Sequence, residues 1–110
     1  MTVTPKALAD GILLTDSEVP IYTAPALTIA AVHSITLCNT DSSDRTVTLW
    51  IIPSGQTSSA RYRVYTVMTV KANQTIQDDA LRNLEPGDFI SALADVTNKV
   101  TIRIDGAEIT

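Results

Sequence analysis

Residues 27–53 read LTIAAVHSITLCNTDSSDRTVTLWIIP, and this stretch decides the predicted fold. Its first part alternates between apolar and polar residues, which is typical of a half-buried β-strand. The alternation places five apolar side chains on one face, namely Leu27, Ile29, Ala31, Ile35 and Leu37. Residues 45–52 alternate in the same way and are rich in Val and Thr, which favours a second strand. The residues between them, Asp41–Asp44, have hairpin turn chemistry.

Turn signals recur along the rest of the chain and separate further short strands. We predict strands over five more ranges, which are 18–24, 61–70, 74–78, 89–93 and 100–105, and residues 12–15 could form another. Glu85-Pro-Gly-Asp88 has the residues of a type II turn, because Pro presets φ and Gly supplies a positive φ. Ala80–Leu84 is predicted as one helical or 3₁₀ turn, and Asp105-Gly106 as a turn before an extended tail. Seven to nine evenly spaced short strands predict an all-β, antiparallel β-sandwich of jelly-roll type.

The length of 110 residues fits one domain. Residues 1–10 are mixed in character and begin with the extended segment Met1–Pro5, so we expect an extended N-terminal arm there. Residues 11–110 are then the sandwich domain. A chain of this size buries a core without needing disulfides or metals.

Composition restricts the classes of partner. The formal net charge is −4 and the eight basic residues are scattered, which argues against nucleic acid as a partner. No apolar run approaches the roughly 20 residues that span a bilayer, so we expect no membrane partner. The single cysteine, Cys38, excludes an internal disulfide. The first ten residues lack the apolar core of a secretion signal, so we expect synthesis in the cytoplasm.

No residue pattern predicts catalysis, a metal site or a cofactor. His33 is the sole histidine and has no evident partner, so we interpret it as structural or as part of an interface. Cys38 lacks a cationic neighbour that would activate the thiol, and we expect a buried small apolar side chain. The acidic residues match no calcium loop, and we expect them to cap turns; they are Asp41, Asp44, Asp78, Asp79, Glu85 and Asp88. We therefore predict that the chain is not an enzyme.

Aromatic and basic residues give the candidate interface. Trp50 lies opposite the apolar face of its strand, where it indicates a second packed layer or a subunit contact. Arg61 and Arg63 would lie on one strand face, where they could form contacts between subunits. The predicted interface residues are Trp50, Arg61, Tyr62, Arg63 and Tyr65. A carbohydrate platform made of Trp50, Tyr22, Tyr62 and Tyr65 is the alternative for the aromatic residues.

Four segments carry a resemblance to a known kind of protein. They are Ile21-Tyr-Thr-Ala-Pro-Ala26, Ile35-Thr-Leu-Cys-Asn-Thr40, Val47-Thr-Leu-Trp-Ile-Ile-Pro53 and Leu84-Glu-Pro-Gly-Asp-Phe-Ile-Ser-Ala92. In this order they resemble small structural proteins of tailed bacteriophages. The resemblance implies a virion β-sandwich, and it carries over no functional residues.

From this resemblance we expect a capsid decoration (cement) protein located in the virion. It would bind the major capsid protein or other virion proteins as a homo-oligomer, either a dimer or a trimer, and stabilise the assembled shell by mass action. A collar, tail or fibre component is one alternative. A carbohydrate-binding module is the other.

Overall fold

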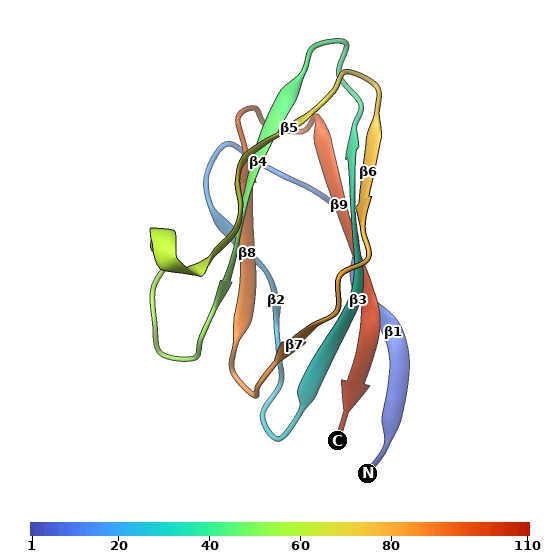
Figure 1. Ribbon diagram of the computed structural model, residues 1–110, viewed down its shortest axis with the longest axis vertical. Coiled ribbons are helices and arrows are strands. Elements are labelled where there is room, and N and C mark those ends of the chain that lie inside the picture. The colour runs from blue at the N-terminus through green and yellow to red at the C-terminus, as the bar shows by residue number, and fades with distance from the viewer.

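In the computed structural model, which describes residues 1–110, two antiparallel sheets pack face to face (Figure 1). Sheet A contains, in spatial order, β1 (Val3–Leu13), β9 (Val100–Ile109), β3 (Ile29–Asn39) and β6 (Thr75–Asp78), with β7 (Arg82–Leu84) also paired to β3. Sheet B contains β2 (Val19–Thr23), β8 (Phe89–Ala94), β4 (Arg45–Ile52) and β5 (Arg63–Val70). The first four strands alternate between the sheets, as in a jelly roll.

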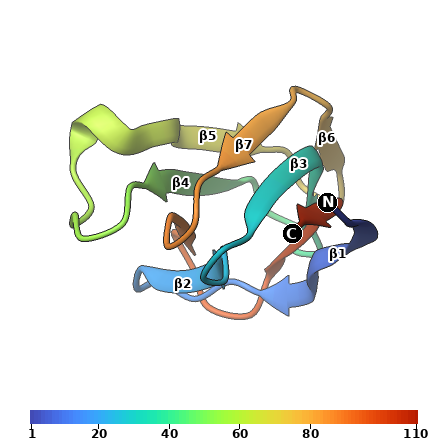
Figure 2. The same cartoon turned by 90° about the horizontal axis from the view of Figure 1, so that it is seen from below.

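The predicted all-β sandwich is therefore confirmed. The chain has no α-helix, and its single helical turn is the 3₁₀ segment η1 (Ala60–Tyr62) between β4 and β5. No helix in the structure has the length and apolarity to cross a membrane. Viewed along the sandwich, β4, β5 and the loop that joins them project to one side (Figure 2).

The core lies between the two sheets. Val100, Ile102 and Ile104 of β9 all point into it, as their alternation predicts, and all three are fully buried. Val47 and Leu49 of β4 meet them from sheet B. Burying one such aliphatic side chain stabilises the fold by about 1.5–3 kcal/mol, so the apolar contact between the sheets is the main source of stability.

The predicted hairpin at Asp41–Asp44 is wrong. The segment is a loop, but β3 belongs to sheet A and β4 to sheet B, so the loop crosses from one sheet to the other. The hydrogen-bonded neighbours of β4 are β5 and β8. Both β3 and β4 have an apolar face, and each face is buried by the opposite sheet rather than by pairing between the two strands.

The predicted inward face of residues 27–39 is correct only for its second half. Ile35 and Leu37 are buried, but before them Ala30 and Val32 point inward, while Ile29 is exposed. The pairing of β3 with β9 shifts register at His33, which is the extra residue of a β-bulge. One extra residue exchanges the two faces of a strand, because side chains alternate with a period of two.

The predicted turn at Asp105-Gly106 is also wrong, because β9 continues to Ile109. Gly106 is needed for a close approach to β3. A Cβ atom at this position would lie 2.0 Å from the backbone oxygen of Ala31, which leaves no room for any other residue.

The predictions for the N-terminal segment and for residues 80–84 differ in outcome. The segment expected as an extended arm, residues 1–10, is extended but largely paired, since β1 runs along β9 from Val3 to Leu13. The backbones of Thr2 and Thr110 exchange two hydrogen bonds of 2.8 and 2.9 Å, so both ends of the chain lie together (Figure 1). The predicted helical turn at 80–84 is wrong, since residues 82–84 form β7.

The turn predicted at Glu85–Asp88 is confirmed. The backbone N–H of Asp88 donates to the carbonyl of Glu85 at 3.0 Å, and Gly87 has φ +87°. The Asp88 carboxylate accepts hydrogen bonds from the backbone N–H groups of Glu85 and Ser54. This turn therefore leads directly into β8 and fixes the neighbouring 53–59 loop to it.

Candidate functional site

The five predicted interface residues surround the β4–β5 connection, but they do not share one exposed surface. Arg61 and Arg63 are exposed, Tyr62 is half-buried, and only 6% of Trp50 and 8% of Tyr65 are accessible. Their assignment to an interface stays a prediction. Trp50 and Tyr65 are already buried within the subunit, so the two arginines are the members available to a partner.

Arg63 covers Trp50 on the outer face of sheet B. The two residues are directly opposite in the β4–β5 pairing, and the guanidinium carbon of Arg63 lies 5.7 Å from the centroid of the indole ring. Arg61 lies over Tyr62 in the same way at 5.1 Å. These distances suit cation–π contacts, so each arginine is positioned by an aromatic ring rather than by a carboxylate.

Tyr65 points in the opposite direction, into the core. Its hydroxyl donates to Asp78 Oδ2 at 2.6 Å, so a side chain of sheet B is bonded to one of sheet A. Arg82 lies 3.2 Å from the same carboxylate. Burial and the neighbouring carboxylate raise the pKa of Tyr65, and the hydrogen bond from Tyr65 is the main cause that lowers the pKa of Asp78. We call Tyr65–Asp78 the β5–β6 pair.

A second pair of the same type joins the sheets on the opposite side of the sandwich. The Tyr22 hydroxyl donates to Glu108 Oε2 at 2.5 Å, and Lys6 lies 3.2 Å from the other oxygen of that carboxylate. Burial is the main cause that raises the pKa of Tyr22, while the hydrogen bond from Tyr22 lowers the pKa of Glu108. We call Tyr22–Glu108 the β2–β9 pair.

The sequence analysis missed both pairs. Glu108 shares its parity with Ile102 and Ile104, so continuing the alternation past Gly106 would have placed it on the inward face. Asp78 has a comparable signal, because it shares its parity with Ile76, which packs against the core.

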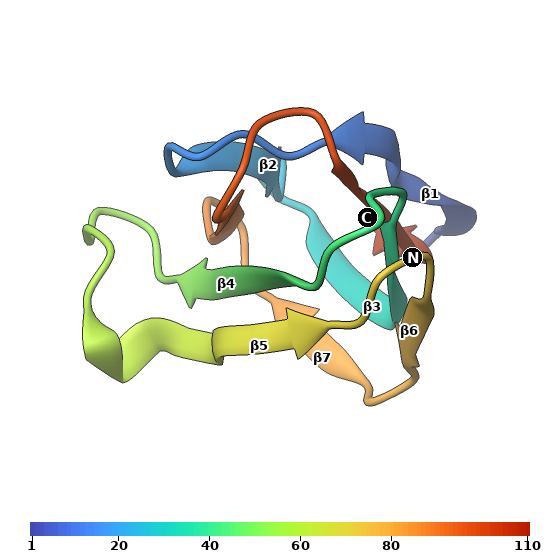
Figure 3. The ribbon, with the colours of Figure 1, turned by 90° about the horizontal axis from the view of Figure 1, so that it is seen from above.

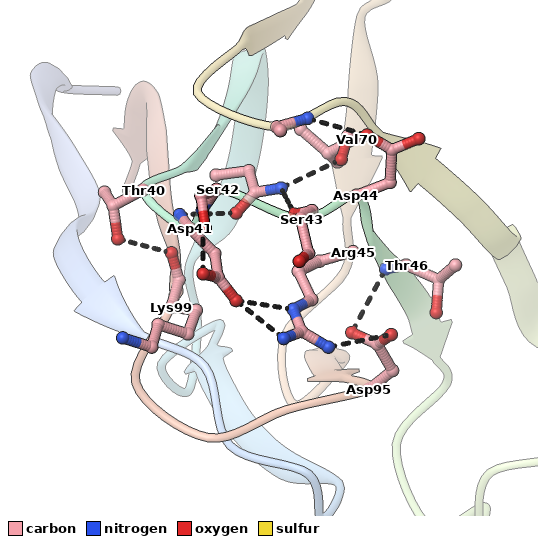
Figure 4. Close-up of polar contacts among 12 residues, drawn as sticks. Thr40, Asp41, Ser42, Ser43, Asp44, Arg45, Thr46, Val70, Asp95 and Lys99 are labelled. Carbon is pink, nitrogen blue, oxygen red and sulfur yellow. Dashed lines mark hydrogen bonds and ion pairs between the residues drawn. The ribbon is translucent and has the colours of Figure 1, made fainter.

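The acidic residues of the loop between β3 and β4 cap backbone groups, as predicted (Figure 4). Asp41 accepts from the N–H of Ser42 and from Arg45, which also lies 3.8 Å from Asp95. Asp44 accepts from the N–H of Ala72 at 2.9 Å. The hydrogen bond from Arg45, and then that from the N–H of Ser42, lower the pKa of Asp41. This network holds the crossing loop in place.

Buried Asn39 completes that network from the end of β3. Its side-chain amide donates to the carbonyls of Ser43 and Val70, and its oxygen accepts from the N–H of Asp41. No buried side-chain polar atom in the structure lacks a partner. The cluster is thus internally satisfied, which explains it as a structural feature.

His33 and Cys38 lie on β3 outside this network. His33 is exposed at the β-bulge, consistent with the predicted structural or interface role but without a catalytic partner. Cys38 is half-buried rather than buried, and its thiol is free. In the pairing of β3 it stands opposite Thr101 and Thr75, so it belongs to the outer face of sheet A.

The predicted carbohydrate platform does not form. Trp50 and Tyr65 are buried and belong to opposite faces of sheet B, so they cannot stack on one sugar. The surface contains no pocket, and no three His, Cys, Asp or Glu residues lie together as metal ligands would. The accessible features that remain are the edges of the sheets and single exposed apolar side chains such as Leu27 and Leu81.

Sheet B has two unlike edges. One edge of sheet B is formed by β5 (Figure 3). This strand carries Arg63, and Arg61 lies just before it; both side chains are exposed. At the other edge, exposed Asp16 and Glu18 precede β2. Asp16 accepts a hydrogen bond from Thr97 and Glu18 accepts one from Ser91, but neither forms an ion pair. One edge is therefore basic and the other acidic.

These features define the class of the molecule as a small jelly-roll sandwich with a satisfied interior and charged, unpaired sheet edges. No protein-family model matches the chain, and no curated protein matches it in sequence. A solved structure does match, that of the Bacillus endospore appendages described as a novel family of disulfide-linked pili. The match has a TM-score of 0.61 and 15% identity, and covers 99% of this chain and 88% of that chain. At this identity the similarity shows the fold alone.

The predicted function in a bacteriophage capsid is contradicted by this comparison. The matching protein is a structural one, but it is a bacterial appendage, and nothing supports a phage role as decoration, collar, tail or fibre component. The motifs behind the prediction form strands and turns of the jelly roll; Leu84–Ala92, for example, is the Gly87 turn and β8. Such motifs report a fold, and one fold serves many functions. The virion location and the capsid partner stay predictions.

Proposed function

We propose that this protein is a structural subunit that associates with further copies of itself through the edges of its β-sheets. The similar protein forms pili, and we propose a role of this kind for the present chain. A homo-oligomer was also expected from the sequence. The edges found here favour a ring or a filament over a symmetric dimer, because the two edges of sheet B are unlike.

The observation that carries the proposal is the exposed edge formed by β5. This strand has eight residues without proline, and it is the last strand of sheet B. Its Val67 side chain is 58% exposed. An edge strand presents unpaired backbone N–H and C=O groups, and proteins usually shorten, cover or block such an edge. Here the edge is long, and although two bulges interrupt its pairing with β4, its outer backbone groups are available between them to pair with another chain.

The single cysteine limits how copies could be joined. One disulfide per subunit connects two subunits and cannot extend a row, and Cys38 is the sole cysteine of this chain. The contact that we propose is therefore non-covalent, in contrast to the disulfide links named for the similar pili.

The test is the size distribution of the purified protein as a function of concentration. We expect sedimentation velocity to show growing oligomers and negative-stain microscopy to show rings or filaments, both unchanged by a reducing agent. The Cys38→Ser variant is the matched control and should assemble equally well. A protein that stays monomeric up to its solubility limit would contradict the proposal.

A further inference from the structure

The order of strands in sheet B determines how a second copy could extend it. All three neighbouring pairs, β2–β8, β8–β4 and β4–β5, are antiparallel. With four alternating strands, the outermost strands β2 and β5 run in opposite directions. A copy shifted sideways along the sheet, without rotation, therefore brings its β2 antiparallel to β5 of the first copy. The pairing that results continues the alternation of the sheet.

The register of the sheet places opposite charges at the same level. Arg63 is opposite Trp50, Trp50 is opposite Ser91, and Ser91 is opposite Pro20, so these residues form one row across all four strands. The Ser91 hydroxyl donates to Glu18 at 2.6 Å. Arg63 and Glu18 thus lie at the two ends of one row, on the outer face of sheet B.

The charges at the two ends form no ion pair within the subunit. Of the eight basic residues, five form ion pairs, namely Lys6, Arg45, Lys71, Arg82 and Arg103. Arg61 and Arg63 form none and lie at the β5 edge. Asp16 and Glu18 form none and lie beside β2. The distribution is complementary between the edges, while two β5 edges or two β2 edges would repel each other.

We propose that β5 of one copy pairs antiparallel with β2 of the next, with Arg61 and Arg63 facing Asp16 and Glu18. The contact rests on the proposed function and specifies its partner as a second copy of this chain. Pro20 removes one N–H donor from β2, so the backbone ladder is short. The ion pairs then provide the selectivity of the contact and set its register.

The test exchanges the charges of each edge separately. The variant Arg61→Glu/Arg63→Glu has two acidic edges, and the variant Asp16→Lys/Glu18→Lys has two basic edges. We expect each alone to self-associate about a hundredfold more weakly than the wild type, because like charges then face one another. Mixed in equal amounts, the two variants should co-assemble, since every contact in an alternating row pairs unlike edges.

Two controls separate edge pairing from other effects of charge. The variant with all four substitutions keeps the net charge of −4 and should regain self-association at the wild-type level. Lys99→Glu changes the charge of an exposed lysine that forms no ion pair, and it should leave assembly unchanged. Circular dichroism and thermal unfolding verify that each variant is folded.

The outcomes distinguish this inference from the proposed function. If the wild type assembles and both edge variants assemble equally well, the β5–β2 contact is wrong while the proposed function stands. Loss of assembly in both variants without recovery in the mixture also overturns the pairing. If the wild type stays monomeric, both the proposed function and the β5–β2 contact are wrong.

Discussion

The β5–β6 pair and the β2–β9 pair make the same chemical contact in different surroundings. Each joins a tyrosine of sheet B to a carboxylate of sheet A, and each carboxylate also has a basic neighbour. Tyr65 is part of the core and only 8% exposed, whereas Tyr22 packs against the core from outside and is half-buried. From this difference we expect burial, rather than the hydrogen bond itself, to decide how much each pair stabilises the sandwich.

The largest expected effect comes from removing the tyrosine side chains. Tyr65→Ala should lower the free energy of unfolding by about 3–5 kcal/mol, because it leaves a cavity in the core. Tyr22→Ala should cost about 1–2 kcal/mol, since part of that ring already contacts water. Urea denaturation followed by circular dichroism measures both. Equal losses would contradict the comparison.

Removing only the hydroxyl groups separates hydrogen bonding from packing. Tyr65→Phe should cost about 1.5–3 kcal/mol, because the bond is to a charged acceptor in a buried site. Tyr22→Phe should cost less than half of that, since water can replace the hydroxyl at Glu108. Double-mutant cycles with Asp78→Asn and Glu108→Gln would give the coupling energies, and a larger coupling in the β2–β9 pair would reverse the order.

Acid should weaken both pairs. The folded-state pKa values of Asp78 and Glu108 are lowered, so their contribution to stability is present above the unfolded values of about 4. It is lost as the pH falls through the lower, folded values. Unfolding free energies measured between about pH 5 and pH 2 should therefore decrease. Because Tyr65 is the main cause of the low pKa of Asp78, Tyr65→Phe should reduce this decrease, and an unchanged slope would contradict the assignment.

The smallest effects belong to the basic neighbours. The Arg82 side chain is 23% exposed, and Arg82→Ala should lower the free energy of unfolding by about 1 kcal/mol. The Lys6 side chain is 45% exposed, and Lys6→Ala should lower it by less than about 0.5 kcal/mol. Thermal unfolding at low and high salt provides the measurement. A strong salt dependence of the wild type that disappears in Lys6→Ala would show that the exposed ion pair contributes more than expected.

Alternation along the sequence predicted most of the strands because it is a local property. It correctly assigned β2, β4, β8 and the inward residues of β9. It failed where geometry depends on a neighbouring strand. The bulge at His33 and the close approach at Gly106 both arise from the β3–β9 pairing, and neither leaves a signal in one strand alone.

The candidate site was only partly predictable for the same reason. The exposed arginines of the β5 edge were identified from their spacing. Trp50 and Tyr65 were grouped with them, although one lies on the outer face of sheet B and the other points into the core. The acidic edge at Asp16 and Glu18 was missed, because two carboxylates in a loop indicate no interface by themselves. Only the strand order shows that they lie at one edge of sheet B while Arg61 and Arg63 lie at the other.

The pairing of Thr2 with Thr110 has a mechanical consequence. The first and last strands lie antiparallel with their free ends together, so a force that pulls the two ends of the chain apart opens the β1–β9 hydrogen bonds one after another. Such unzipping needs far less force than shearing many bonds at once. A pulling force applied to the two ends of the subunit would therefore open it easily. A force transmitted through the strands of sheet B would not act on the β1–β9 pairing.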